Sequence, residues 1–235
     1  MEHDSRNPQL WNERGRIHYK SKGGFAHHQY EFLSLLRPSR GVDEGGAGAR
    51  SKCLDDPSYR LNLHPALTLL QVVSSIVLQS DDLDEIDWEI IGSNTTHAET
   101  NYYGKGNTTG AISRAEWLPS PSAPQTDFHN YTTNWSKDKL EWYLDGALVR
   151  TLAYEDANGG KSFPQTPCQL KLGIWAGGDP AGNNYTIQWA GGEIDYSKGP
   201  YSMYVKSARV TDASSGMQYK YGDQVGSWQS IQIVA

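Results

Sequence analysis

The sequence predicts an all-β protein built as a sandwich or jelly roll, and three observations support this fold class. Apolar runs of strand length recur from Val72 to the end of the chain. Clusters of glycine, proline and asparagine separate these runs, as turns between strands require. No segment shows the 3.6-residue apolar repeat of an amphipathic helix. Many short strands joined by such turns are typical of β-sandwiches and jelly rolls.

The expected strands follow one another through the later part of the chain. The apolar-rich runs are, in order, residues 72–78, 85–91, 169–175, 203–210 and 228–234. Residues 140–144 and 147–149 flank Asp145-Gly146, a two-residue turn that strongly favours a β-hairpin. A chain of 235 residues can bury one sizeable core, so a single folded domain is the natural expectation.

Residues 1–71 differ in composition from the rest, with Arg- and Gly-rich stretches and no strand pattern. The adjacent His27-His28 lacks metal-ligand spacing, and no phosphate-binding pattern follows Gly45-Gly46-Ala47-Gly48. Residues 65–70 allow a short helix, because proline is tolerated in a first turn. We therefore expect an atypical N-terminal segment (1–71) without assigned function, a domain over 72–235, and a sandwich that is incomplete at its N-terminal side.

Composition excludes several functions. The formal net charge of -6 argues against nucleic acid and against anionic membrane surfaces as partners. No apolar stretch is long enough to span a membrane, and neither a signal peptide nor an anchor signal is visible. The 8 tryptophans and 14 tyrosines far outnumber the 4 phenylalanines, and rings with a polar handle suit stacking on sugars. The two cysteines, Cys53 and Cys168, allow at most one disulfide.

Five glycosylation sequons favour a secreted protein. N-x-[ST] triplets occur at Asn94, Asn107, Asn130, Asn134 and Asn184. Such triplets also arise by chance in turns, but five of them in β-type sequence favour a secreted, glycosylated surface. The polar and charged N-terminus argues the other way, so the sequence leaves the compartment open.

The run Glu85-Ile86-Asp87-Trp88-Glu89 carries three carboxylates at every second position. Strand side chains alternate between faces, so the three acids line one surface while Ile86 and Trp88 point into the core. The outer Cα atoms lie roughly 13 Å apart at about 3.3 Å per residue, and inward-leaning side chains can bring the carboxyl groups to the ~5–5.5 Å of a retaining glycosidase. A solvated acidic strand face is the alternative, but mutual repulsion makes it a costly one.

Retaining glycosidases divide the work between two carboxyl groups. One stays ionised and attacks the anomeric carbon, and the other holds a proton for the leaving oxygen. Asp87, between them, can share a proton with the nucleophile and push the titrations of its neighbours apart. Glu193-Ile194-Asp195 repeats the first three letters, but Ser197 stands at the fifth position, so this copy predicts an ordinary strand or turn.

Five further blocks accompany the acidic motif: VSSIVL (73–78), NYYGKG (101–106), LGIWAGGDP (172–180), WAGG (189–192) and GPYSMYVK (199–206). With these blocks, residues 72–235 resemble glycoside hydrolase family 16 and, within it, the fungal Crh-type chitin–glucan transglycosylases of the cell wall. The acidic motif marks the wider family, whereas the IWAGG and WAGG blocks mark the subgroup.

The resemblance implies a concanavalin-like β-jelly roll with a concave substrate cleft. It makes Glu85 the nucleophile, Asp87 the assisting carboxylate and Glu89 the general acid/base, with no metal and no cofactor. It also implies that Glu89 and six further side chains contact sugar: Asn101, Tyr103, Lys171, Trp175, Thr186 and Trp189. Some similar proteins carry arginine where Lys171 stands, and a point charge orients a sugar less firmly than a forked donor.

The expected function is a retaining transglycosylase that cleaves chitin and transfers it to β-glucan, its polysaccharide partners, outside the cell or in the wall. Retention permits transfer because a sugar hydroxyl can replace water in attacking the glycosyl-enzyme. The alternatives are a plain chitin or glucan hydrolase, a catalytically inactive carbohydrate-binding jelly roll, and a truncated product.

Overall fold

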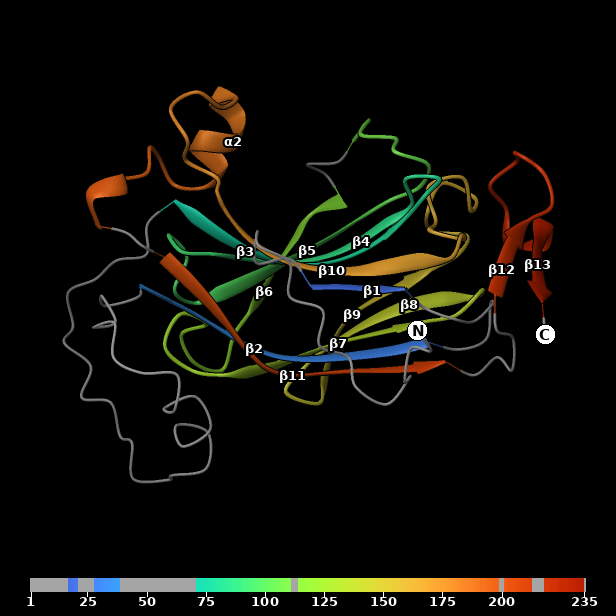
Figure 1. The fold of residues 1–235 in the computed structure, drawn as a ribbon, viewed down its shortest axis with the longest axis horizontal. Helices are drawn as coiled ribbons and strands as arrows, with labels where there is room; N and C mark the ends of the chain where they lie inside the picture. The colour runs from blue at the N-terminus through green and yellow to red at the C-terminus, as the bar shows by residue number, and fades with distance from the viewer. Residues whose placement is uncertain are drawn as a thin grey trace, which may run out of the picture.

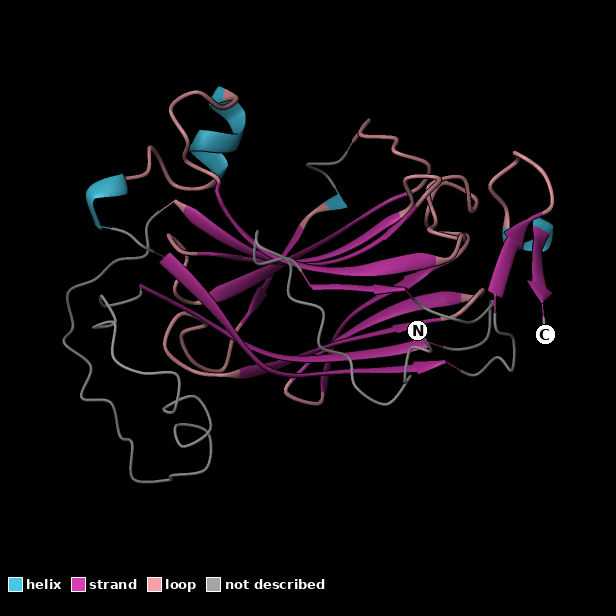
Figure 2. Cartoon of the chain, in the orientation of Figure 1, coloured by secondary structure: helices cyan, strands magenta, loops and turns pink. Residues whose placement is uncertain are grey.

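The computed structural model describes residues 17–20, 28–38, 71–110, 114–198, 201–212 and 218–234. These residues form two large antiparallel sheets that lie face to face, with a small strand pair at the C-terminal side (Figure 1). Strands dominate the described chain, and helices are limited to single turns or little more (Figure 2). The predicted all-β sandwich is confirmed.

The larger sheet has six strands, and β4, one of its two central strands, carries the acidic motif. In spatial order they are β1 (Ile17–Lys20), β10 (Cys168–Ala176), β3 (Val72–Ser80), β4 (Glu85–Ile91), β5 (His97–Tyr103) and β6 (Glu116–Pro119). Since β4 is paired on both sides, its side chains are held in a fixed register to both neighbours.

The second sheet has five strands, in the order β11 (Tyr201–Asp212), β2 (His28–Pro38), β7 (His129–Trp135), β8 (Lys139–Leu144) and β9 (Ala147–Ala153). The remaining elements are β12 (Gln218–Tyr221), β13 (Ile231–Val234), α2 (Asn184–Trp189), η1 (Tyr196–Lys198) and η2 (Trp228–Ser230). The expected hairpin is confirmed as β8–β9, where Asp145 and Gly146 have the positive φ angles that such a tight turn requires. No described helix is long and apolar enough to cross a membrane.

The core lies between the two large sheets and takes the inward residues of β4. Ile86, Trp88 and Ile90 are at most 2% exposed. The indole of Trp88 packs edge-on against the ring of Tyr131 from β7, with centroids 5.2 Å apart. Each such buried side chain stabilises the fold by about 1.5–3 kcal/mol relative to an exposed one. The period-2 pattern of the motif thus fixes β4 with its apolar side inward and its carboxylates outward.

The prediction that residues 1–71 contribute no strands is wrong for two segments. β1 pairs with β10, and β2 lies between β11 and β7 as an inner strand of the second sheet. Sheet edges left open by β7 and β11 would expose unpaired backbone groups, and β2 supplies their partners. The predicted strandless character followed from the composition of the whole segment, which hides the run at 28–38. Cys53, His27 and the helix expected at 65–70 lie outside the described residues.

Candidate active site

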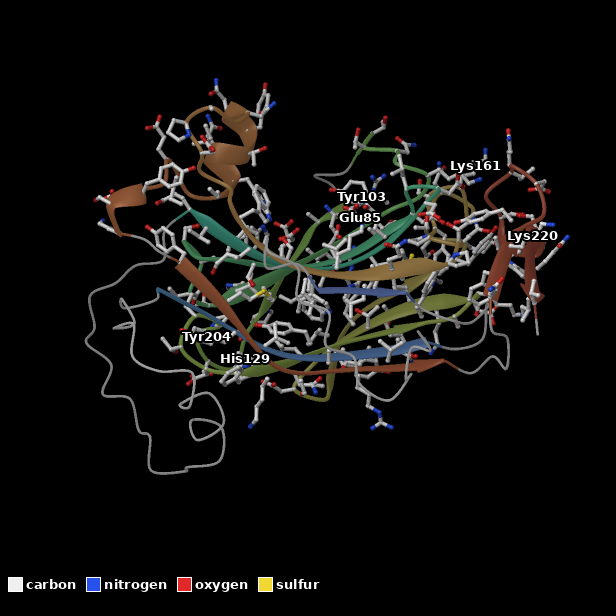
Figure 3. All side chains as sticks on the ribbon, in the orientation of Figure 1. Glu85, Tyr103, His129, Lys161, Tyr204 and Lys220 are labelled. Carbon is white, nitrogen blue, oxygen red and sulfur yellow. The ribbon has the colours of Figure 1, made fainter. Side chains whose placement is uncertain are left out.

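The outward face of the larger sheet gathers the polar residues of four adjacent strands. On β4, Glu85 lies opposite Tyr103 of β5, and Glu89 lies opposite Glu99. Directly opposed residues share one face of an antiparallel pair. The positions aligned on this face are Ser75, Val77 and Gln79 on β3, Glu85, Asp87 and Glu89 on β4, Glu99, Asn101 and Tyr103 on β5, and Lys171 and Trp175 on β10. Glu85 and Tyr103 lie together on this side in Figure 3, away from the second sheet.

Glu89 is held by a hydroxyl and surrounded by negative charge. The Ser75 hydroxyl donates to Glu89 Oε2 at 2.5 Å. Burial raises the pKa of Glu89 to about 8, the negative charges of Glu99 and Glu85 add to the rise, and the hydrogen bond from Ser75 opposes it. A carboxyl group with this pKa holds its proton at neutral pH and can give it to a leaving group.

Asp87 is the most deeply placed of the three motif acids, at 4% exposure. Burial raises its pKa well above the ordinary range, and the charges of Glu85 and Glu89 raise it further. Asp87 also forms a side-chain hydrogen bond with Glu85, and this contact favours its protonated form. A protonated Asp87 therefore donates to Glu85 and orients that carboxylate.

Glu85 receives a second donor from an amide relay. Gln79 Nε2 donates to Glu85 Oε2, and Lys171 Nζ donates in turn to Gln79 Oε1. The lysine thereby fixes which end of the Gln79 amide faces Glu85. Lys171, expected to contact sugar, lies on the site face with its ammonium one side chain removed from the carboxylate.

Asn101 and Tyr103 form a pair on β5 beside the carboxylates. Asn101 Nδ2 donates to the Tyr103 hydroxyl at 3.1 Å. Burial, together with the charges of Asp87 and Glu85, raises the pKa of Tyr103 to about 12. Its hydroxyl therefore stays protonated and can donate to an oxygen above Glu85 over the whole neutral range.

The two tryptophans stack on each other beside the acids. Their ring centroids lie 5.9 Å apart at an interplanar angle of 20°, and Trp175 is 40% exposed. Trp175 Nε1 donates to Ser75 Oγ at 2.8 Å, and Trp189 Nε1 donates to Glu99 Oε2 at 2.8 Å. Both rings therefore border the carboxylate face; their mutual stacking covers one face of each ring, and Trp189 also packs against the buried cluster of Val73, Ile91 and Ala190.

Trp189 and Thr186 come from α2, which rises above the larger sheet (Figure 1). Asn183 caps this helix by accepting from the backbone N–H of Tyr185 at 2.8 Å. Trp189 reaches the carboxylate face, whereas within the described chain no hydrogen bond joins the Thr186 side chain to the three motif acids. Thr186 lies half-buried on α2.

Three residues of the face were missed by the sequence analysis: Ser75, Gln79 and Glu99. Each contacts one of the expected site residues directly. The alternation of Glu99, Asn101 and Tyr103 in one polar run was a usable signal for Glu99. Within the described part of the chain, no group of three His, Cys, Asp or Glu side chains is arranged to hold a metal ion.

Comparisons with known proteins agree with this geometry. The sequence profile of glycosyl hydrolases family 16 matches residues 71–191, just over half of the chain. Crh-like protein 2 of Botryotinia fuckeliana is 59% identical over 171 residues, which are 72% of this chain and 38% of that protein. Crh-like protein 5 of Aspergillus fumigatus is 58% identical over 162 residues, 69% of this chain and 40% of the relative. The chain thus spans about two fifths of the length of these relatives.

Solved structures extend the likeness to the fold. Crh5 transglycosylase in complex with NAG is 42% identical with a TM-score of 0.74, over 95% of this chain and 80% of that one. A β-glucanase of Bacillus licheniformis superposes with a TM-score of 0.55 at 19% identity, over 84% of this chain and 71% of the glucanase. The second match supports the sandwich fold alone.

Proposed function

The chain belongs to glycosyl hydrolases family 16, and from this premise we propose that it is a retaining transglycosylase of the Crh type that cleaves chitin and transfers the cut end to β-glucan. The observation that carries the proposal is the contrast between two carboxyl groups on one face. Glu89 has a pKa of about 8 and is therefore protonated at neutral pH, whereas Glu85 accepts hydrogen bonds from two neighbours, Gln79 and Asp87. The catalytic domain comprises residues 72–235 together with β1 and β2.

The first step forms the glycosyl-enzyme. Glu89 gives its proton to the oxygen of the scissile glycosidic bond, and a Glu85 oxygen attacks the anomeric carbon as that bond breaks. The leaving chain departs as an alcohol, and the donor sugar is joined to Glu85 through an ester. Asp87, hydrogen-bonded to Glu85, fixes the attacking oxygen.

The second step transfers the sugar. Glu89, now a carboxylate, takes the proton of an incoming hydroxyl while that oxygen attacks the anomeric carbon and the ester to Glu85 breaks. A glucan hydroxyl gives transfer and water gives hydrolysis. Transfer is supported by the similarity to Crh5, which is named a transglycosylase, and chitin as donor by the NAG in that complex.

Sugar binding is assigned to the side chains around the two acids. Trp175 and Trp189 offer aromatic surface to the sugar, and Asn101, Tyr103 and Lys171 offer polar contacts beside Glu85. Thr186 on α2 is assigned the contact farthest from the reacting atoms. A binding-only module has no need of a carboxyl group that stays protonated at neutral pH, so the arrangement favours an enzyme.

The enzyme acts outside the cell, in the wall, as a glycoprotein. Asn107 and Asn184 are the exposed sequon asparagines among the five. Asn134, by contrast, donates to Glu141 at 2.9 Å and is only partly accessible. Glycans therefore attach at Asn107 and Asn184, which a peptide map of protein secreted from a fungal host tests directly.

Product analysis tests the function. The protein is incubated with a chitooligosaccharide donor and a fluorescently labelled β-glucan oligosaccharide acceptor, and products are resolved by mass. We expect a hybrid chain carrying both the label and N-acetylglucosamine units, absent with Glu85→Gln. Chitooligosaccharide shortening without any hybrid would make the protein a hydrolase, and binding without turnover would make it a carbohydrate-binding module.

A further inference from the structure

A chain of side-chain contacts begins at Glu89 and ends at Glu99, the residue that lies opposite Glu89 on β5. Ser75 Oγ donates to Glu89 Oε2 at 2.5 Å and accepts from Trp175 Nε1 at 2.8 Å. The Trp175 ring stacks on Trp189, whose Nε1 donates to Glu99 Oε2 at 2.8 Å. Glu99 lies directly opposite Glu89 in the β4–β5 register. Residues from β3, β10, α2 and β5 thus surround one carboxyl group.

We propose that Glu99 is a positioning residue that stays ionised, held by Trp189, and thereby keeps the proton on Glu89 for the first step. The proposal rests on the assignment of Glu89 as proton donor and adds how this side chain keeps its proton. Glu99 itself does not touch the reacting atoms.

The strand register places Glu89 and Glu99 opposite each other, so ionisation of one carboxyl group disfavours ionisation of the other. Side chains directly opposite each other in an antiparallel pair have Cβ atoms about 4.5–5.5 Å apart. Carboxyl groups on directly opposed residues repel each other when both are ionised, so a charge on one favours the protonated form of the other. The question is which one is better stabilised as an anion.

The contacts favour Glu99 as the anion. Burial raises the pKa of Glu99, but the indole N–H of Trp189 and the positive charge of Arg150 oppose that rise. Arg150 is itself buried, with Nη1 donating to the carbonyl of Thr100, the residue next to Glu99. Within the described part of the chain, Glu89 accepts a side-chain hydrogen bond from the Ser75 hydroxyl alone. A charged Glu99 and a protonated Glu89 is therefore the lower-energy arrangement.

Other titratable groups around Glu89 do not reverse this order. Among the residues whose side chains the structure describes, they are Glu85 and Asp87 on β4, Glu99 and Tyr103 on β5, and Lys171 on β10. The ammonium of Lys171 is engaged by Gln79 on the side of Glu85, and β3 presents Ser75, Val77 and Gln79, which do not titrate. The remaining charge near Glu89 is negative and also favours its protonated form.

Ser75 acts in the opposite sense. Its oxygen accepts the indole N–H of Trp175, so its one proton is directed to Glu89 and stabilises the carboxylate. This contact suits the second step, in which Glu89 must accept a proton from the acceptor. Glu99 and Ser75 thus bias the same side chain toward its two successive states.

The test is the alkaline limb of kcat/KM against pH, measured with an unactivated oligosaccharide donor. Glu99→Gln should move the limb down by about one pH unit or more, because the negative charge on the directly opposed residue is removed. Trp189→Phe, which keeps an aromatic ring but loses the N–H, should move it down by less. Ser75→Ala should move it up. Glu141→Gln, which removes a buried carboxylate from β8 in the other sheet, is the matched control and should leave the limb in place.

The variants Glu89→Gln and Glu99→Gln test the proton donor and the role of Glu99 separately. If the wild-type limb persists in Glu89→Gln, then Glu89 is not the proton donor. If the limb disappears in Glu89→Gln but stays unmoved or rises in Glu99→Gln, the role of Glu99 is overturned. If Glu99→Gln does not fold, Trp189→Phe decides: a downward shift supports the proposal, and an unmoved limb contradicts it.

Discussion

Raising the pH through the titration of Glu89 should remove the proton that the first step needs. With a pKa of about 8, about nine tenths of Glu89 is protonated at pH 7 and about one tenth at pH 9. The value of kcat/KM should therefore fall about tenfold between these two pH values. A glutamate at the ordinary value of 4.5 would be less than about 1% protonated at pH 7 and could not serve as the donor.

Two donors with the same sugar chain and different leaving groups make the assay specific. An oligosaccharide donor has an alcohol leaving group that needs the proton, whereas a dinitrophenyl glycoside does not. The alkaline limb should appear for the first donor and be absent or much weaker for the second. A limb below pH 6, or an equal limb for both donors, would refute the assignment of the raised pKa to Glu89 as proton donor.

Three further changes have defined outcomes. Glu85→Gln should abolish hydrolysis and transfer together while circular dichroism stays unchanged, since a neutral amide is a poor nucleophile; substantial residual turnover would mean a misassigned nucleophile. Asp87 has a folded-state pKa raised well above 3.8, so its contribution to stability is present below that value and is lost as pH rises. Asp87→Asn should therefore raise the free energy of unfolding in urea at pH 8 relative to wild type, with a smaller gain at pH 4; equal effects at both pH values would argue against a buried, titrating Asp87. Asp84 is fully buried and accepts from the backbone N–H groups of Gln165 and Thr166, so Asp84→Ala should cost about 3 kcal/mol or more by leaving buried donors unpaired, and a change in urea midpoint near zero would contradict this.

Strong alternation made part of the fold predictable. Ile86 and Trp88 alternate with the three acids, so a strand can bury these two side chains only by placing the acids on the opposite face. This run forms β4 in the structure. The Asp145-Gly146 turn predicted β8 and β9 for a similar local reason. The sequence signals that predict these elements lie within a few consecutive residues.

Other elements were missed because their signal is not local. β5 reads HAETNYY, with polar residues on the site face and Ala98, Thr100 and Tyr102 on the core face, so only a weak apolar alternation marks it. β2 was hidden by the Arg- and Gly-rich sequence around it. Its place between β7 and β11 depends on pairing with chain segments about 100 or more residues away, which a window of sequence does not contain.

The site residues also divide into those that a local sequence pattern predicts and those that only the strand registers bring together. The spacing of Glu85, Asp87 and Glu89 placed them on one face, but Ser75 and Glu99 are brought to Glu89 only by the registers of β3 and β5. The Trp189 contact with Glu99 depends in addition on where α2 rests over the sheet. Motif residues can thus be named from sequence, whereas the residues that tune them require the sheet.

In the proposed mechanism, Glu85 forms the covalent glycosyl-enzyme while Glu89 carries the proton. Mass spectrometry of Glu89→Gln mixed with an activated chitooligosaccharide donor tests it most directly, because the ester forms without the acid and is then slow to break. We expect an intact-mass increase equal to the oligosaccharyl group of the donor without its leaving group, a peptide map that places it on Glu85, and release by azide as a glycosyl azide of retained configuration. Turnover without an adduct, an adduct on another residue, or a product of inverted configuration would contradict it.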